Sequence, residues 1–206
     1  MMQLRKKQLE IFLQKVPTFQ NPQASLEQYL TPASIVADII YQAFCANDIA
    51  KRSVVDLGCG TGIFSFGAKM AHAALVTGVD IDQNSIRIAE EFAKNHKITV
   101  SFLCQDVNTI DITADTVLMN PPFGAQKSNI HADRAFMEKA FEIAPVIYSL
   151  HLSSTIPFVS KLIAALKGEI SFQTSYQFSL KGIYSFHKKE QMDVGVTLLR
   201  ILRGAD

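Results

Sequence analysis

The segment Asp56-Leu57-Gly58-Cys59-Gly60-Thr61-Gly62 joins a short apolar run to a helical pattern. The run that leads into it, residues 53–57, has the length and branched side chains of a buried strand, and residues 63–73 have helical spacing. Glycines at such a turn permit positive φ and let a ligand lie against the backbone, while the helix N-terminus offers free N–H groups. The segment therefore predicts a ligand site where a strand of an α/β sheet passes into a helix.

Beyond this turn, apolar strands alternate with helical patterns. This alternation is typical of a mostly parallel sheet with helices on both faces. The further strands are expected at residues 75–79, 98–103, 116–119 and 146–151, and the helices at residues 83–95, 132–142 and 156–166. Two longer strands, at residues 170–178 and 193–202, should close one edge as an antiparallel pair. The prediction is an α/β fold with a seven-stranded, mostly parallel sheet and an antiparallel C-terminal strand.

The N-terminal region precedes this alternation. Residues 3–16 have the spacing of an amphipathic helix that Pro17 should stop. A second helix should run from Pro32 to about Asn47, with Thr31 as its N-terminal cap. We expect residues 1–32 to form an N-terminal helix and a covering segment, and residues 33–206 to form a single domain.

Composition describes an ordinary globular chain. With 206 residues, 48% hydrophobic and 19% charged, it is long enough to bury about 70% of its unfolded surface in one core. No apolar run reaches about 18 residues, and the N-terminus lacks the apolar block of a signal peptide. Three cysteines without CxxC spacing give poor support to a disulfide framework or a metal site, so a cytoplasmic location is expected. The net charge of +1 means that any nucleic-acid binding must rest on local basic patches or on a partner.

Acidic residues follow the ends of the first three predicted strands. Asp80 lies about 20 residues beyond the glycine turn, where a carboxylate can accept two hydrogen bonds from a ribose diol. Asp106 follows the third strand and is placed to reach an adenine amino group. Gly58, Gly60 and Gly62 run as G-x-G-x-G, which is not the dinucleotide fingerprint, and Asp56 before them would repel a pyrophosphate but suits an ammonium group. The structural alternatives are a helix cap for Asp80 and a turn-stabilising acid for Asp56.

Together these features resemble the class I methyltransferases, which have a Rossmann-like fold and bind S-adenosylmethionine (SAM). The resemblance covers residues 50–155 and implies SAM as the cofactor. It implies cofactor contacts along the turn and at the strand ends, at Asp56, Gly58, Cys59, Gly60, Gly62, Asp80, Ile81, Asp106, Val107 and Asn120.

The segment Asn120-Pro121-Pro122-Phe123 follows the apolar run at residues 116–119. An amino group on an aromatic ring is a poor nucleophile because its lone pair is delocalised. Two acceptors aimed at its hydrogens, the Asn120 side-chain oxygen and the Pro121 carbonyl, favour the tetrahedral geometry in which the lone pair points outward. The prolines fix φ and keep the acceptors in place, and Phe123 is expected to stack on the base. We name residues 120–123 the platform.

An Asn-Pro dipeptide alone is also a common turn. At the end of the fourth strand of such a sheet, however, the platform resembles the amino-methyltransferases that act on adenine, cytosine or glutamine nitrogens. The catalytic residues that this implies are Asn120, Pro121, Pro122 and Phe123.

Four separated motifs narrow the resemblance further: Leu26–Pro32, Asn120–Gly124, Tyr148–His151 and Phe186–Lys189. In this order they are similar to the archaeal and eukaryotic rRNA adenine-N6 methyltransferases, which modify one adenosine in small-subunit rRNA. The resemblance implies that Gln28, Tyr29 and Thr31 lie over the cofactor. The segment at residues 125–134 departs from the lysine- and glycine-rich version of the eukaryotic members, so contacts there are not carried over.

Basic side chains could hold RNA phosphates around a flipped-out base. The candidates flank the platform or lie near the C-terminus: Lys127, Arg134, His187, Lys188 and Lys189. The resemblance also implies a small zinc-binding activator protein, which would pair with the third strand at an exposed edge of the sheet.

Other functions remain open from sequence. A protein-glutamine N5 or DNA-adenine N6 methyltransferase would use the same platform, although the glutamine enzymes usually carry Tyr at the position of Phe123. A DNA enzyme would be expected to carry a target-recognition insert, for which 206 residues leave little room. The alternative from another class is a SAM-binding ribosome-assembly factor without turnover. His151 and Cys59 are expected to be a core histidine and a small filler.

Overall fold

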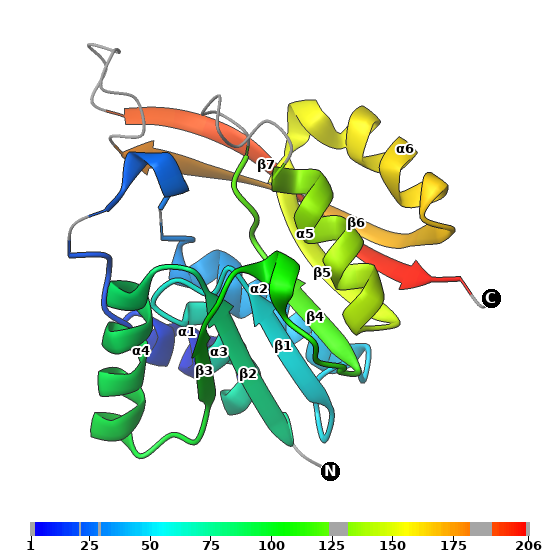
Figure 1. The fold of residues 1–206 in the computed structure, drawn as a ribbon. Coiled ribbons are helices and arrows are strands. Elements are labelled where there is room, and N and C mark those ends of the chain that lie inside the picture. Colours follow the sequence, from blue (N-terminus) through cyan, green and yellow to red (C-terminus); the bar gives the residue numbers. More distant parts are fainter. Residues whose placement is uncertain (1–2, 21, 29, 124–131, 182–190, 205–206) are drawn as a thin grey trace.

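The computed structural model describes residues 3–20, 22–28, 30–123, 132–181 and 191–204. Two N-terminal helices precede a succession of strands and helices that follows the predicted alternation (Figure 1). The helices are α1 (Lys6–Leu13), α2 (Ala33–Cys45), α3 (Ile63–Met70), α4 (Gln83–His96), α5 (Ala132–Ile143) and α6 (Ile156–Ala165). The strands are β1 (Ser53–Leu57), β2 (Leu75–Asp80), β3 (Ser101–Cys104), β4 (Thr116–Met119), β5 (Val146–Leu152), β6 (Gly168–Lys181) and β7 (Gln191–Arg203). Short 3-10 turns are η1 (Ala24–Leu26), η2 (Val107–Thr109) and η4 (Ser153–Thr155).

The seven strands form one sheet in the order β3-β2-β1-β4-β5-β7-β6. Strands β1 to β5 are parallel, whereas β7 is antiparallel to both of its neighbours, β5 and β6. The predicted fold class and the antiparallel C-terminal strand are confirmed. The order reverses between β1 and β4, and in open α/β sheets ligands bind beside such a reversal, outside the carboxyl ends of the strands.

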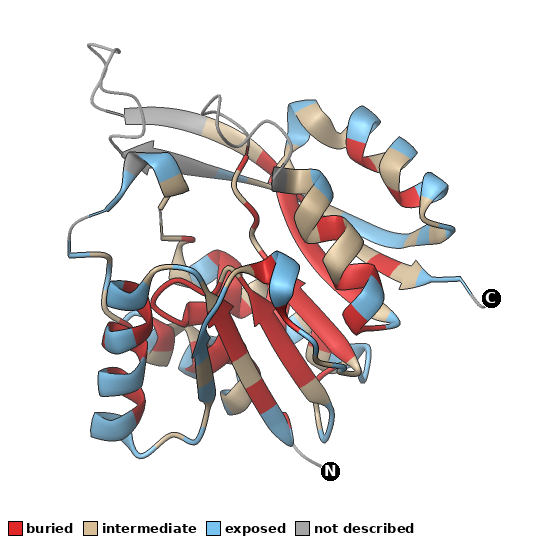
Figure 2. Ribbon diagram, viewed as in Figure 1, coloured by how far each residue is buried: buried red, intermediate tan, exposed pale blue. Residues whose placement is uncertain are grey.

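Each face of the sheet has its own core, because alternate residues of a strand point to opposite faces. Leu118 of β4 belongs to the core beneath α1, α2, α3 and α4, whereas Val117 and Met119 belong to the core beneath α5 and α6. The middle strands are buried, and exposure increases toward β3 and on the outer sides of α4 and α6 (Figure 2). The sheet is therefore held rigidly where β1 and β4 end.

A polar network joins the amino-terminal half of β5 to the loop after α2. Asp48 accepts hydrogen bonds from Arg200 Nε at 2.8 Å and from Tyr148 Oη at 2.6 Å. Burial, and then the bond to Asp48, raise the pKa of Tyr148. The network lies at the amino ends of the parallel strands, away from their carboxyl ends, and it fixes β5 and β7 against the loop after α2.

Most of the predicted elements differ from the observed ones by a few residues at their ends, and two of these differences have a clear physical reason. The third strand, expected at residues 98–103, begins at Ser101, because Ile98 and Val100 pack as loop residues against the core beneath α4. Helix α2 begins at Ala33 with Pro32 as its N-cap, and no side chain caps it, so the capping role predicted for Thr31 is wrong. In the described residues no helix has the length and apolar character needed to cross a membrane.

Candidate active site

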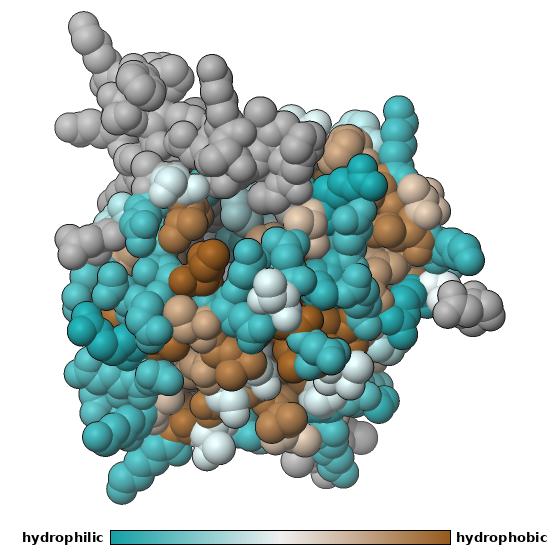
Figure 3. Space-filling view, in the orientation of Figure 1, coloured by the Kyte–Doolittle hydropathy of each residue, from teal (hydrophilic) through white to brown (hydrophobic). Residues whose placement is uncertain are grey.

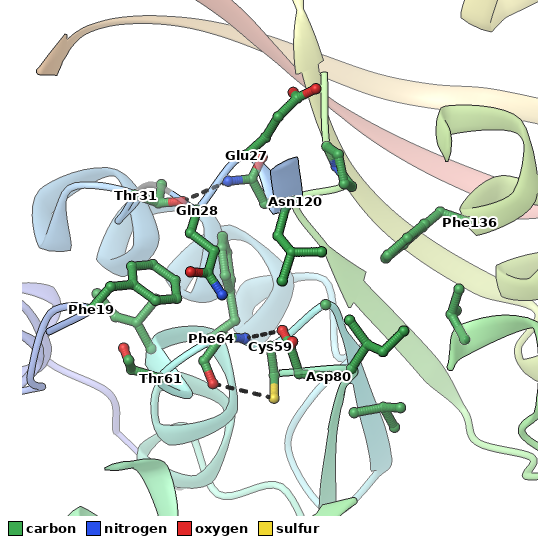
Figure 4. A pocket seen from close by; sticks show the side chains of 18 of the residues that line it. Phe19, Glu27, Gln28, Thr31, Cys59, Thr61, Phe64, Asp80, Asn120 and Phe136 are labelled. Carbon is green, nitrogen blue, oxygen red and sulfur yellow. Dashed lines mark hydrogen bonds between the residues drawn. The ribbon is translucent and has the colours of Figure 1, made fainter. Parts of the chain in front are cut away.

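A cavity of about 250 Å³ lies at the carboxyl ends of β1, β2 and β4. This volume is near the lower end of the range for small-molecule sites, roughly 300–1,000 Å³. Its wall combines the glycine turn, the end of β2, the η2 turn, the platform and the segment between α1 and α2 (Figure 4). On the face seen in Figure 3, apolar residues gather in the middle, between hydrophilic ones over α4 and α5.

The glycine turn adopts the conformations that its residues predict. Gly58, Gly60 and Gly62 have φ of +69°, +53° and +88°, in the left-handed region that side chains other than glycine rarely adopt. A Cβ on Gly60 would lie 2.8 Å from the ring of Phe19. Gly58, Cys59 and Gly60 line the cavity, whereas Gly62 is the N-cap of α3 and packs against phenylalanine rings of the core.

Asp80 lies at the end of β2 and lines the cavity, as predicted. Its Oδ2 accepts a 2.7 Å hydrogen bond from the Gly60 amide, and its Oδ1 accepts one of 2.9 Å from the Asp82 amide. A carboxylate has about four acceptor positions, so each oxygen keeps one for a ligand hydroxyl. Burial raises the pKa of Asp80. The geometry leaves Asp80 able to accept two hydrogen bonds from a diol.

The η2 turn adds the residues expected after the third strand. Asp106 is its N-cap, with Oδ1 accepting from the Asn108 amide at 2.9 Å. Its other oxygen has no hydrogen bond to the described part of the chain. Asp106, Val107 and Ile81 all line the cavity. This corner can therefore offer an acceptor beside an apolar surface, which suits a purine ring with an amino group.

Asp56 does not lie where it could contact the ammonium group of a ligand, which was its predicted role. It does not line the cavity, and it is 1% exposed beneath the turn. Its Oδ2 accepts from the Ser65 amide at 2.8 Å and from the Ser65 hydroxyl at 2.6 Å. Burial, although opposed by these bonds, raises the pKa of Asp56 to about 7. The structure thus supports the alternative reading, an acid that stabilises the turn, over direct contact with a ligand ammonium.

The platform follows β4, and two of its four residues line the cavity, Asn120 and Pro122. Asn120 Nδ2 donates a 2.9 Å hydrogen bond to Thr31 Oγ1, which also lines the cavity (Figure 4). Pro121 is buried and is not among the residues that line the cavity. The cavity that holds the glycine turn thus also holds the Asn120 side chain.

The position of the Phe123 side chain differs from the predicted one beside the substrate base. Its side chain is 8% exposed, belongs to the core beneath α1 to α4, and does not line the cavity. The described position therefore does not support the predicted stacking of Phe123 on a base. Sequence reasoning also missed three aromatic residues that do line the cavity: Phe19, Phe64 and Phe136. They come from separate parts of the chain, and only the cavity brings them together.

We call residues 19–31 the strap, because they cross from α1 to α2 beside the cavity. Gln28 Nε2 donates a 2.8 Å hydrogen bond to Asp82, the N-cap of α4, and Gln28 Oε1 accepts from the Gln23 amide at 2.8 Å. Although burial opposes it, hydrogen bonds from Ser85 and Gln28 lower the pKa of Asp82. Gln28 and Thr31 line the cavity, as the resemblance implied, and Tyr29 lies outside the described residues.

Comparison with known proteins agrees with this geometry. The family model "Methyltransferase small domain" matches residues 35–144. The rRNA N(6)-adenosine-methyltransferase METTL5 of Danio rerio is 35% identical over 96% of this chain and 98% of its own length. The chain belongs to the methyltransferase family that this model and this relative represent.

Solved structures extend the likeness to the whole fold. A protein of Pyrococcus horikoshii, proposed to be an RNA methyltransferase, is 33% identical, with a TM-score of 0.91 over 99% of this chain and 100% of that one. Magnesium protoporphyrin IX methyltransferase of Synechocystis, solved with bound SAM, has a TM-score of 0.65 over 82% of this chain and 78% of that one. At 17% identity this second likeness shows the fold alone.

SAM is the methyl donor of this methyltransferase, and the cavity fits it. Asp80 has acceptor positions for the ribose hydroxyls, and Asp106 and Val107 suit the adenine ring. The glycine turn leaves room beside the backbone at Gly58 and Gly60.

Cys59 and His151 are structural, as expected. Burial raises the pKa of the Cys59 thiol well above its ordinary value, which disfavours the thiolate that a cysteine nucleophile needs. His151 is fully buried, with Nε2 2.6 Å from Ser149 Oγ and Nδ1 4.0 Å from Asp133 Oδ1. Burial lowers the pKa of His151 to about 4 and raises that of Asp133 to about 6. Ser149 and His151 lie outside the cavity lining, so this Ser-His-Asp set has no access to a substrate there.

Of the residues predicted to hold RNA, the structure describes one. Arg134 is exposed in the first turn of α5 and pairs with Glu138 at 2.7 Å. Lys127, His187, Lys188 and Lys189 lie outside the described residues. Among the N-terminal basic residues, Lys6 pairs with Asp38 at 2.6 Å and so has a structural partner.

Proposed function

We propose that this methyltransferase transfers a methyl group from SAM to the N6 amino group of an adenosine in small-subunit rRNA. The observation that carries the proposal is the platform: Asn120 reaches the same cavity as the glycine turn and Asp80. Family membership favours an rRNA adenosine over a glutamine amide or DNA, because relatives that span nearly the whole chain are named rRNA N6-adenosine methyltransferases.

The chain's own residues supply positioning and acceptors. SAM supplies an electrophilic methyl group on a sulfonium. The Asn120 carbonyl oxygen and the Pro121 main-chain carbonyl accept hydrogen bonds from the two amino hydrogens, which turns the nitrogen lone pair away from the ring. Acceptors fixed in advance need little reorganisation when charge develops on the amino nitrogen. The nitrogen would gain one methyl group as the bond from that methyl to the donor sulfur breaks, which leaves a neutral thioether, and the nitrogen would then lose one proton. No general base is needed until that proton leaves.

Labelled SAM incubated with separate pools of total RNA, DNA and protein tests the proposal. Nucleoside mass spectrometry of the labelled fraction should find N6-methyladenosine, and the label should lie in small-subunit rRNA. Label in protein glutamine or in DNA adenine would overturn the assignment of the substrate. SAM binding without transfer to any pool would favour an assembly factor without turnover.

We propose that basic side chains that flank the platform in the sequence or lie near the C-terminus hold RNA phosphates: Lys127, Arg134, His187, Lys188 and Lys189. Support comes from the exposed position of Arg134 in the first turn of α5. Charge contacts of this kind are weakened by salt. Arg134→Gln should lower RNA affinity and reduce the salt dependence of binding, and an unchanged salt dependence would contradict the role of Arg134.

We further propose a protein partner, a small zinc-binding activator, on the free edge of β3. Strand β3 is the last strand of the sheet on its side, and Leu103 on it is 36% exposed. Unpaired strand edges are routinely covered by another chain or element. The three cysteines are free, which fits the reducing cytoplasm where we place the complex.

Co-purification tests the partner. Leu103→Glu should release it, whereas Leu75→Glu, at the exposed start of β2, should not. Full activity of the isolated chain without any complex would contradict this proposal and leave the proposed reaction intact.

A further inference from the structure

Asp82 was not singled out from the sequence, and it is not among the residues that line the cavity. It lies two positions after Asp80, where it is the N-cap of α4, and its carboxylate also accepts hydrogen bonds from the strap. We propose that Asp82 is a positioning residue that holds the strap against the cavity and so retains bound SAM. This inference concerns the cofactor site and does not depend on which molecule receives the methyl group.

The strap forms a large part of the cavity wall. Figure 4 shows Phe19, Gln28 and Thr31 along one side of the cavity, with Phe136 on the other. Movement of the strap away from the glycine turn would therefore widen the cavity on this side. Six described residues of the strap line the cavity: Phe19, Leu26, Glu27, Gln28, Leu30 and Thr31.

The Asp82 carboxylate accepts hydrogen bonds from both the strap and α4. Its Oδ2 accepts from Gln28 Nε2 at 2.8 Å and from Ser85 Oγ at 2.7 Å. Its Oδ1 accepts from the Asn84 amide at 3.2 Å and, more weakly, from Gln23 Nε2 at 3.4 Å. A carboxylate has about four acceptor positions, so these bonds use its full capacity. Asp82 thus joins the strap to the first turn of α4.

The partners of Gln28 set the direction of its bonds. An ionised carboxylate can only accept a hydrogen bond, and a backbone amide can only donate one. Gln28 Nε2 faces Asp82 Oδ2, and Gln28 Oε1 accepts from the Gln23 amide at 2.8 Å. With the amide reversed, its oxygen would face the carboxylate and its NH₂ group would face an N–H group. The contacts therefore hold Gln28 in one orientation and close residues 23–28 into a turn that Asp82 fastens.

Asp82 is itself fixed beside the expected ribose site. Its main-chain amide donates a 2.9 Å hydrogen bond to Asp80 Oδ1. Its side chain caps α4, and Ile86 and Ala89 of this helix are buried in the core. The residue that fastens the strap therefore also helps to orient the carboxylate that we expect to accept from the ribose. This arrangement positions the strap relative to that end of the cavity.

The strength of the bond between Gln28 and Asp82 sets the size of the expected effect. Hydrogen bonds to charged groups contribute roughly tenfold or more to an equilibrium constant, and solvent screening lowers this where the pair is partly exposed. The bond is partly buried. We expect its loss to raise the rate of SAM dissociation by roughly three- to tenfold, because the strap then opens more often. The rate of association should stay within about twofold, because the bond belongs to the closed strap.

Asp82→Asn removes this bond with little other change. Asparagine is as good an N-cap as aspartate, and no residue of the cavity lining is altered. With the asparagine oxygen toward the Asn84 amide, its NH₂ group faces the NH₂ group of Gln28, so two donors meet. Labelled SAM bound to the variant and chased with excess unlabelled SAM should be released roughly three- to tenfold faster than from the wild type. A wild-type release rate would overturn the inference.

Asp115→Asn is the matched control. Asp115 also accepts hydrogen bonds from a serine, with Oδ2 2.7 Å from the Ser53 amide and 2.8 Å from its hydroxyl. It lies at the amino ends of β1 and β4, away from the cavity. SAM release from Asp115→Asn should match the wild type, and an increase equal to that in Asp82→Asn would overturn the inference.

A double variant tests whether Asp82 acts through the strap. Gln28→Met keeps the length of the side chain and removes its donor. If Asp82 acts through Gln28, SAM release from the variant with both substitutions should match that from Gln28→Met within about twofold. Effects that multiply would show that Asp82 acts by another route, and would overturn the inference.

Hydrogen exchange of the ligand-free protein gives a readout that does not depend on SAM. In Asp82→Asn the amides of residues 23–28, and that of Gln23 above all, should exchange faster than in the wild type. Those of α4 beyond its first turn should be unchanged. Faster exchange throughout α4, with the strap unaffected, would show that Asp82 only stabilises the helix and would overturn the inference. Methylation of protein or DNA would instead overturn the proposed substrate, so the two failures are distinguishable.

Discussion

The Gly60 amide donates a 2.7 Å hydrogen bond to Asp80 Oδ2, and this bond joins the turn after β1 to the carboxyl end of β2. It orients the carboxylate toward the cavity before any ligand is present. A carboxylate fixed in this way loses little freedom when it accepts the hydroxyl groups of a ribose.

Asp80→Ala should therefore weaken SAM binding by at least tenfold, because it removes both the acceptor that we expect for the ribose hydroxyls and the bond that holds Gly60. Titration calorimetry measures the change. Asp111→Ala, at an exposed acid outside the cavity lining, is the matched control and should bind as the wild type does. Equal SAM affinity in Asp80→Ala and the wild type would refute the ribose contact.

Asn120→Ala should separate binding from chemistry. We expect SAM affinity to change by less than about threefold, because Asp80 and the glycine turn, where we expect the main cofactor contacts, are unchanged. Methyl transfer should fall by about a hundredfold or more, the usual loss when one group that stabilises developing charge is removed. Single-turnover assays with labelled SAM provide the measurement, and unchanged turnover would contradict the mechanism.

Gly60→Ala tests the conformation of the turn. The new Cβ would lie 2.8 Å from the Phe19 ring at a φ of +53°, so both the backbone and the strap must shift. SAM affinity should fall at least tenfold, and thermal stability should also fall. Gly195→Ala in β7 is the control, since its nearest neighbours are the ends of side chains at 3.2 and 3.3 Å. Similar SAM affinity in the two variants would show that the turn tolerates a side chain.

Asp56 makes stability depend on pH. Its folded-state pKa of about 7 is above the ordinary value of 3.8, so its stabilising contribution is complete below about pH 4 and is lost as the pH rises toward 7. Between pH 5 and 7 the free energy of unfolding of the ligand-free protein should fall by up to about 2 kcal/mol on this account. Burial raises the pKa of Asp133 and of Asp80 as well, and both act in the same direction.

Urea unfolding at pH 5, 6 and 7 checks this expectation. Asp56→Asn keeps an acceptor for Ser65 but cannot titrate, so its unfolding free energy should depend less on pH than that of the wild type. The same slope in both proteins would show that Asp56 stays ionised when folded.

The sequence was sufficient for the features that local pattern determines. The strand, glycine turn and helix around Gly58 follow from residue type alone, and so does the antiparallel pair at the C-terminus. The sequence was insufficient for features that depend on contacts between segments far apart in the chain. The hydrogen bonds that Asp56 accepts from Ser65 and that Thr31 accepts from Asn120 compete with the local roles that each residue type suggests, and the sequence pattern cannot decide between them. The short β3 is likewise set by pairing with β2, and the position of Phe123 by packing.

The hydrogen-bond network around Asp48 should stabilise the fold without affecting the cavity, because it lies at the other end of the sheet. Asp48→Ala removes the partner of Arg200 and Tyr148, whose side chains lie largely inside the protein. The free energy of unfolding should fall by about 2 kcal/mol, and Tyr148→Phe should cost about half as much. Denaturant titration measures both, and SAM affinity should stay unchanged in both variants. A loss of SAM affinity in Asp48→Ala would mean that the two ends of the sheet are coupled.

The strap is anchored at both ends: α1 packs its Leu9 and Leu13 into the core, and Pro32 leads into α2. It is therefore a closed loop and not a free tail. Any outward movement of this loop is a bulge between two fixed points, which costs little entropy and leaves the core intact. Extensions added before α1 should not alter the rate of ligand exchange, whereas residues inserted within the loop should.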